Sequence, residues 1–252
     1  MATADLRPLP DVMIIGTQRG GTTSLHTWLC AHPQVGPFGS DEVHYFDGSY
    51  FRGERWYRSH FPLKYPRRVS VVASPYMMFH PLAAERAGHD LPPSTRFLAV
   101  LREPAERAMS HYRLERSLGR ESETFARALE LEDSRLDGER EKLETGGRSR
   151  NYRWHSYRAR GRYAEQLQRW YEVVGLDRVM VLESERLFEG SGLGGDLLRW
   201  LGLPPLDVPY PALNASPEPT PEDKAVLGDL RAYYEPYNEA LFELLGRRLW
   251  TE

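Results

Sequence analysis

The run Val12–Leu25 is the part of the sequence that most constrains the fold. It begins with four apolar residues typical of a buried strand, turns at a glycine-rich segment, and continues as Thr-Thr-Ser at the start of an amphipathic stretch. A strand, turn and helix in this order direct backbone N–H groups and the positive end of the helix dipole at an anion, usually a phosphate. The spacing from Gly16 to Gly21 matches the G-x-x-x-x-G of a P-loop, but Thr22 stands where a nucleotide kinase has lysine. The sequence therefore predicts a phosphate site without the lysine of a kinase.

Apolar runs recur along the chain and alternate with helical patterns. Near-continuous apolar strands are typical of a parallel sheet buried on both faces, and alternation with helices indicates that helices cover those faces. We therefore expect an α/β protein with a P-loop-like three-layer fold, in which helices flank a central parallel β-sheet. The expected strands are Val12–Ile15, Val69–Ala73, Phe97–Leu101 and Val179–Leu182, and the expected helices are Thr22–Ala31, Pro81–Ala87, Pro104–Leu118, Phe125–Leu131 and Tyr163–Val173.

The length of 252 residues suits one α/β domain with a large core and leaves little room for a second. We expect a single domain over residues 1–252, in which residues 1–10 form an N-terminal tail. Residues 121–150 carry nine carboxylates, so we expect a charged surface insertion made of a helix and a mobile loop. Residues 202–221 hold seven prolines and should form an irregular connection before C-terminal helices.

Composition excludes several classes of protein. A formal net charge of −3 argues against a protein that coats nucleic acid through its overall charge. The single cysteine, Cys30, excludes an internal disulfide and a cysteine-based metal site. No run reaches the length of a membrane span, and residues 1–10 lack the pattern of a signal peptide. We therefore expect a cytoplasmic protein that binds neither nucleic acid nor membrane, with its oligomeric state left open.

Two further segments carry side chains suited to anion binding and proton transfer. One places Arg102 at the carboxyl end of an expected strand, where open α/β sheets bind ligands. Its guanidinium is a candidate phosphate contact because it can form paired hydrogen bonds with phosphate oxygens. In the other, from Asp41 to Asp47, Glu42 or His44 would be a general base if it faces the ligand. An ordinary helix surface and an acidic loop are the alternatives for these two segments.

These segments together resemble the sulfotransferases that use 3′-phosphoadenosine 5′-phosphosulfate (PAPS). Residues 16–25 resemble the family's 5′-phosphosulfate loop, and residues 102–112 resemble its 3′-phosphate segment. The stretch Glu-Val-His-Tyr-Phe-Asp at 42–47 is similar to the Glu-Val-His-Phe-Phe-Asp of the heparan sulfate glucosaminyl branch. Similarity at 73–76 and 160–167 extends the resemblance over nearly the whole chain.

The resemblance implies an enzyme that transfers the sulfuryl group of PAPS to a hydroxyl or amine of a carbohydrate or other small-molecule acceptor, and the departures described below indicate a soluble, bacterial-type member. The implied reaction is an in-line displacement at sulfur that releases 3′-phosphoadenosine 5′-phosphate (PAP) and needs no metal. Glu42 would be the general base, His44 and Asp47 would orient the base or the acceptor, and Arg19 would stabilise the leaving group. The implied donor contacts are Gln18, Arg19, Gly20, Gly21, Thr22, Thr23 and Ser24 for the 5′-phosphosulfate, and Arg102 and Ser110 for the 3′-phosphate.

The sequence departs from the family pattern in several places. Arg19 stands where the family usually has lysine, and a guanidinium is too basic to hand over a proton, so we expect an electrostatic role for it. Val72 and Ala73 offer no charged contact from the second strand. The family's C-terminal disulfide is impossible with one cysteine, and its glycine- and arginine-rich loop has no clear counterpart in residues 214–224.

The acceptor side is less specified by the sequence. Residues 148–163 interleave basic and aromatic side chains, and we expect them to contact donor or acceptor; a solvated loop and a site for single-stranded nucleic acid are the alternatives. The expected acceptor contacts are Asp47, Tyr76, Tyr157 and Arg160. Neither the acceptor nor the choice between O- and N-sulfation follows from the sequence.

Two other functions fit part of the pattern. A P-loop kinase of small molecules fits the glycine-rich loop, but Thr22 replaces its lysine, and no aspartate at the end of an apolar strand is placed to bind Mg²⁺. A catalytically inactive nucleotide-binding relative would keep the fold without turnover. The intact segment from Glu42 to His44 argues against that loss.

Overall fold

The computed structural model describes residues 3–36, 42–63, 69–190, 192–213 and 218–250. Asp41 and residues 214–217, which belong to segments singled out above, lie outside them. The chain divides into two compact units, one made of Met1–Leu101 and Trp170–Leu213 and the other of Arg102–Arg169 and Asn214–Glu252. The expectation of a single domain stays a prediction.

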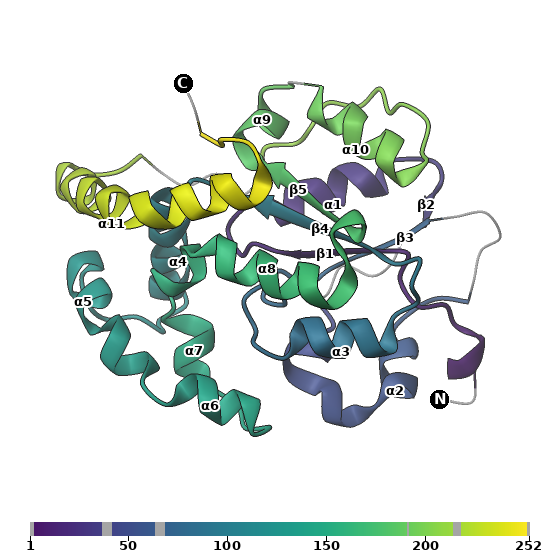
Figure 1. The fold of residues 1–252 in the computed structure, drawn as a ribbon, viewed down its shortest axis with the longest axis horizontal. Helices are drawn as coiled ribbons and strands as arrows, with labels where there is room; N and C mark the ends of the chain where they lie inside the picture. The colour runs from purple at the N-terminus through teal and green to yellow at the C-terminus, as the bar shows by residue number, and fades with distance from the viewer. Residues whose placement is uncertain (1–2, 37–41, 64–68, 191, 214–217, 251–252) are drawn as a thin grey trace. The chain divides into compact units, whose positions relative to one another are not determined.

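The first unit contains a five-stranded sheet in the order β2-β3-β1-β4-β5, with every neighbouring pair parallel (Figure 1). The four expected strands are present with bounds shifted by at most one residue, and the predicted α/β fold with a central parallel sheet is confirmed. The sequence analysis missed β2, because two residues are too few to produce an apolar run. The strands are β1 Val12–Gly16, β2 Val35–Gly36, β3 Val69–Ala73, β4 Arg96–Leu101 and β5 Val179–Glu183.

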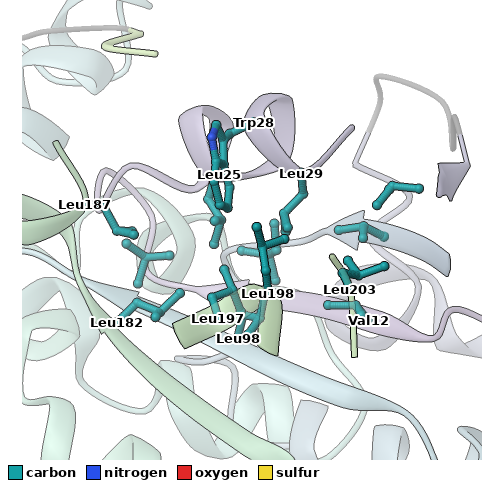
Figure 2. Packing of buried hydrophobic residues seen from close by; sticks show 14 of the residues in the cluster. Val12, Leu25, Trp28, Leu29, Leu98, Leu182, Leu187, Leu197, Leu198 and Leu203 are labelled. Atoms are coloured by element: carbon teal, nitrogen blue, oxygen red, sulfur yellow. The ribbon is translucent and has the colours of Figure 1, made fainter. Parts of the chain in front are cut away.

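Helices cover both faces of this sheet. On one face α1 (Thr22–Cys30) and α10 (Leu193–Leu201) pack their leucines against the strands (Figure 2). Each fully buried leucine contributes about 2 kcal/mol relative to an exposed one. On the other face α3 (Ala83–Asp90) lies under the sheet in Figure 1, and the Trp170 ring lies 5.1 Å from that of Phe97 in β4. The unit also contains α2 Glu54–Arg58 and α9 Ser184–Phe188.

The strand order determines where this sheet can hold a ligand. From central β1 the chain reaches β2 and β3 on one side and later β4 and β5 on the other. A change of direction at a central strand opens a crevice at the carboxyl ends of the strands, and such crevices are where open α/β sheets bind ligands. The glycine-rich loop follows the carboxyl end of β1 directly.

The second unit is helical, and local sequence signals define its two longest helices. Glu103 caps α4, because its carboxylate accepts hydrogen bonds from the N–H groups of Ala105 (3.1 Å) and Glu106 (2.8 Å). At the start of α11, Thr220 and Asp223 form a capping box. Apolar side chains of α4, α5 and α11 share one core. The helices of this unit are α4 Pro104–Ser117, α5 Phe125–Leu136, α6 Glu139–Glu144, α7 Arg150–Trp154 and α11 Pro221–Leu245; α8, Tyr163–Val174, contains the boundary between the units.

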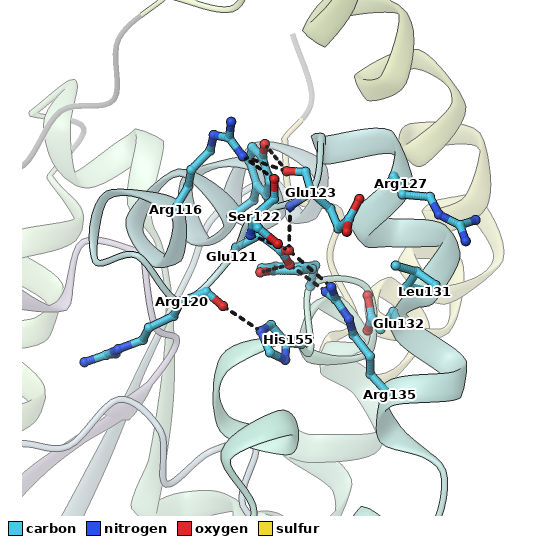
Figure 3. A network of polar contacts seen from close by, with 12 residues as sticks. Arg116, Arg120, Glu121, Ser122, Glu123, Arg127, Leu131, Glu132, Arg135 and His155 are labelled. Carbon is cyan, nitrogen blue, oxygen red and sulfur yellow. Dashed lines mark hydrogen bonds and ion pairs between the residues drawn. The ribbon is translucent and has the colours of Figure 1, made fainter.

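Residues 121–150 are the segment in which we expected a charged surface insertion. They form α5 and α6, and two of their carboxylates, Glu121 and Glu132, are buried. Arg135 lies 2.6 Å from Glu121 (Figure 3). The Tyr157 hydroxyl donates to the same carboxylate at 2.9 Å. Burial alone would raise the pKa of Glu121, but these partners and the Glu123 N–H lower it to about 2. The expectation of a charged surface insertion stays a prediction, but charge content alone did not reveal that these two carboxylates are buried and paired.

The expected N-terminal tail is also part of the fold over its described residues. Residues Ala4–Leu6 form a 3-10 turn, and the Ala4 side chain is fully buried. Arg58 of α2 donates a 2.6 Å hydrogen bond to the Arg7 carbonyl. Among the described residues, no helix combines the length and the apolar character needed to cross a membrane.

Candidate active site

The glycine-rich loop is held tightly against β4. The Thr17 N–H donates to the Val100 carbonyl, and the Gly20 N–H donates to the Thr17 carbonyl, each at 2.8 Å. A Cβ atom at Gly20 would lie 2.5 Å from the Val100 oxygen and 2.8 Å from the Thr17 side chain. Only glycine fits there without displacing the backbone, so the sequence keeps this loop close to the sheet.

The same loop presents polar groups at the start of α1. Gly21 has a φ of 96° and, having no side chain, does not cap the helix. The first N–H groups of a helix lack partners within it, and together with the helix dipole they favour an anion. The Gln18 Oε1 atom is buried and has no hydrogen-bond partner among the described residues. These features fit a phosphate-bearing ligand.

The predicted donor-contact residues of the loop differ in exposure. Thr22 and Ser24 are buried, and Thr23 is exposed. The Ser24 hydroxyl oxygen accepts a 3.1 Å hydrogen bond from the Leu213 N–H. Arg19 is half-buried and has a φ of 69°, in the left-handed region that non-glycine residues seldom adopt.

A chain of polar side chains begins at Glu42. Its Oε2 lies 3.0 Å from His44 Nε2, and His44 Nδ1 lies 3.1 Å from Asp47 Oδ2. The Ser74 hydroxyl donates to the same Asp47 oxygen at 3.1 Å. Exposure decreases along this chain, because 42% of the Glu42 side chain is accessible while that of Asp47 is fully buried. An accessible carboxylate oriented by a histidine with a buried carboxylate behind it is suited to general-base catalysis.

Packing keeps this segment in place. The Tyr45 ring stacks on Tyr57 of α2 with 4.6 Å between ring centroids, and its hydroxyl donates to Asp90 of α3 at 3.0 Å. Burial, followed by the nearby Asp90 carboxylate, raises the pKa of Tyr45 far above its usual value, so the phenol keeps its proton. Arg86 donates a 2.8 Å hydrogen bond to the Phe46 carbonyl. Contacts from two helices therefore position the residues beside Glu42.

In the second unit, Arg102 directly precedes Glu103, the cap of α4. The Tyr163 hydroxyl donates to the Arg102 carbonyl at 2.9 Å, and the guanidinium lies 3.6 Å from Glu106. Arg102 lines a pocket of about 520 Å³ in this unit. Ser110, two turns into α4, is buried. Arg102 is thus open to a ligand, whereas Ser110 is enclosed in the packed helix, and the contact of either with a donor stays a prediction.

The match to a known family decides the identity of the chain. The family model described as the sulfotransferase domain matches residues 9–191. The chain belongs to the sulfotransferase family. It is an enzyme of the PAPS-dependent class that the sequence predicted, and neither the kinase nor the inactive relative is needed to explain its loop.

Relatives of this sulfotransferase include two enzymes named for heparan sulfate. Heparan sulfate glucosamine 3-O-sulfotransferase 6 of Mus musculus is 28% identical over 268 residues, which cover 96% of this chain and 73% of that protein. The bifunctional heparan sulfate N-deacetylase/N-sulfotransferase 1 of Caenorhabditis briggsae is 28% identical over 79% of this chain and 23% of that protein. The crystal structure of a sulfotransferase from Alicyclobacillus acidocaldarius matches with a TM-score of 0.74 at 26% identity, covering 96% of this chain and 98% of the other.

All four residues predicted to contact the acceptor of this sulfotransferase are buried, Asp47 among them as described above. Tyr76 is 5% exposed, and Tyr157 and Arg160 are fully buried. Tyr157 donates to Glu121, and Arg160 donates to the Arg153 carbonyl at 2.7 Å. These contacts give Tyr157 and Arg160 a role in packing the second unit, and the basic and aromatic segment around them is not a solvated loop. Their contact with an acceptor stays a prediction.

Sequence reasoning did not assign a role to Ser74 in this sulfotransferase. It follows β3 directly, and its hydroxyl joins Asp47 across 27 residues of sequence. The available signal was the position of a serine at the carboxyl end of a parallel strand, where ligand sites form. Among the described residues, no group of three or more His, Cys, Asp or Glu side chains is arranged to hold a metal ion.

Proposed function

We propose that this sulfotransferase transfers the sulfuryl group of PAPS to a hydroxyl or amine of a carbohydrate acceptor, with Glu42 as the general base. The observation that carries the proposal is the chain of contacts from Glu42 through His44 to Asp47 and Ser74. Relatives named for 3-O- and N-sulfation of heparan sulfate support a carbohydrate and leave open whether oxygen or nitrogen is sulfated. A small-molecule acceptor other than a sugar is the alternative within the same reaction class.

The proposed donor contacts follow from the chemistry of the two segments. The N–H groups at the start of α1, with Thr22, Thr23 and Ser24, are suited to the 5′-phosphosulfate. In the second unit the guanidinium of Arg102, just before α4, is suited to the 3′-phosphate, together with Ser110 within that helix. A donor without β- and γ-phosphates has no need of the lysine that Thr22 replaces.

The proposed reaction balances as a displacement at sulfur. The acceptor oxygen or nitrogen forms a bond to sulfur while the bond from sulfur to the 5′-phosphate oxygen breaks, and PAP leaves with the bonding electrons. Glu42 takes the proton that the acceptor loses. Both ring nitrogens of His44 face carboxylate oxygens, so a doubly protonated ring would donate to Glu42 and Asp47 together and orient the base. Arg19 stabilises the charge that develops on the leaving phosphate.

The test is the Glu42→Gln variant, assayed for transfer of labelled sulfate from PAPS and for PAP binding by calorimetry. Loss of the base should lower turnover by about 10²- to 10⁴-fold with PAP binding unchanged. Glu54→Gln is the matched control, because its side chain is 44% exposed, against 42% for Glu42, and pairs with Arg58. Turnover that survives Glu42→Gln would show that another group accepts the proton. A cytoplasmic location is also proposed, and cell fractionation tests it.

A further inference from the structure

The second unit contains a charged pocket whose role is only partly assigned. The pocket has a volume of about 520 Å³, and its lining includes three cations, Arg102, Lys224 and Arg231, and two carboxylates, Glu106 and Glu218. Lys224 and Arg231 are seven residues apart on α11, so they lie on one face of that helix. The pocket therefore lies between the residue that precedes α4 and one face of α11. Its lining contains one more cation than carboxylates.

The carboxylates of this pocket are unevenly shared. Glu106 lies 2.8 Å from the Arg231 guanidinium and 3.6 Å from that of Arg102. Glu103 is 3.8 Å from Arg231, and its carboxylate oxygens already accept hydrogen bonds from the N–H groups at the start of α4. One carboxylate thus positions two guanidinium groups without fully neutralising them.

Lys224 differs from the two arginines. Within the part of the chain that the structure describes, no ion pair joins the Lys224 ammonium to a carboxylate, and the residue is exposed on the first turn of α11. By contrast, Lys142 on α6 lies 3.5 Å from Glu139. The Lys224 charge is available to an anion that enters the pocket.

We infer that Lys224 and Arg102 together bind the 3′-phosphate of the nucleotide and that Arg231 completes the positive wall. This inference rests on the proposed function, because it takes PAPS as the donor. An arginine fork and a lysine point charge can bind different oxygens of one phosphate. Since the 3′-phosphate distinguishes PAP from adenosine 5′-phosphate, Lys224 sets the selectivity of the enzyme for 3′-phosphorylated nucleotides.

The experiment measures binding without turnover. Wild-type protein, Lys224→Met and the control Lys142→Met are titrated by calorimetry with PAP and with adenosine 5′-phosphate at one ionic strength. Lys224→Met should weaken PAP binding about tenfold, as expected for one charge-assisted contact, and should leave adenosine 5′-phosphate binding unchanged. Lys224→Arg should retain most of the PAP affinity, and Lys142→Met should bind both nucleotides like the wild type.

The outcomes separate this inference from the proposed function. If wild type and Lys224→Met bind PAP equally, the 3′-phosphate contact is wrong while the donor assignment stands. Equal weakening of both nucleotides would also overturn the inference, because the effect would not depend on the 3′-phosphate. A wild-type protein that does not bind PAP would overturn the donor assignment itself. Thermal unfolding verifies that each variant is folded, as expected for an exposed side chain.

Discussion

Glu132 is a buried carboxylate whose titration should be measurable in the stability of the protein. It lies on α5, is 1% exposed, and accepts hydrogen bonds from the backbone N–H groups of Arg158 (2.6 Å) and Ala159 (2.8 Å). Burial raises its pKa to about 7 from the usual 4.5, although these N–H groups and the charges of Arg158 and Arg107 act in the opposite direction. The perturbation to make is Glu132→Gln, which removes the titration and keeps the shape.

The sign and size of the effect follow from proton linkage. Between pH 4.5 and pH 7 the folded state binds a proton at Glu132 that the unfolded state releases. Stability from this group is therefore fully present below the unfolded pKa and is lost as the pH rises through the folded pKa. Between pH 5 and pH 8 the free energy of unfolding of wild type should fall by about 2 to 3 kcal/mol relative to Glu132→Gln.

The assay is urea unfolding of both proteins at pH 5, 6, 7 and 8, with the difference in unfolding free energy plotted against pH. Taking the difference cancels the titration of groups common to both. Glu130→Gln on the same helix is the matched control, because its side chain is 62% exposed, and its difference from wild type should stay nearly constant. The unfolding free energy of wild type minus that of Glu132→Gln should fall as the pH rises. If this difference stayed constant or increased with pH, the argument that burial dominates at this carboxylate would be refuted.

Three further predictions concern the active site. Arg19→Met should lower turnover by about 10²- to 10³-fold while Arg19→Lys retains much of it; if both variants turned over like wild type, the electrostatic role would be wrong. Gly20→Ala should abolish measurable PAP binding and lower the melting temperature, because the new Cβ would lie 2.5 Å from a carbonyl oxygen. The control Gly195→Ala should do neither, because a Cβ there would have no atom within 4 Å. Equal behaviour of the two variants would contradict the steric argument. Asp47→Asn should lower turnover about a hundredfold with unchanged PAP affinity, and a loss confined to PAP binding would show that Asp47 does not act through His44.

Short-range patterns accounted for the sheet and for the loop. The apolar runs that became β1, β3, β4 and β5 were visible because strands buried on both faces need consecutive apolar residues. The loop after β1 was visible because its glycines meet steric demands that few other residues satisfy. Glu42, His44 and Asp47 lie within six residues, so their association needed only one local turn.

Features that depend on contacts between distant segments were not predictable in the same way. Nothing local marks Tyr157 as buried, since its burial depends on Glu121 and on the core of the second unit. The two-residue strand β2 exists only because it pairs with β3. The basic and aromatic composition of residues 148–163 would be the same whether these side chains faced water or a neighbouring helix, so composition could not predict their burial.

The sequence by itself determined the parallel sheet, the glycine-rich loop after β1 and the motifs that indicate the family, because each of these depends on residues close together in the chain. The tertiary structure alone decided that Ser74 supports Asp47, that Glu132 is buried, and that Lys224 shares a pocket with Arg102. These pairings join segments far apart in sequence, so they are set by how helices and strands pack and not by local periodicity. Burial then changes the chemistry of the groups it brings together, as the raised pKa of Glu132 illustrates.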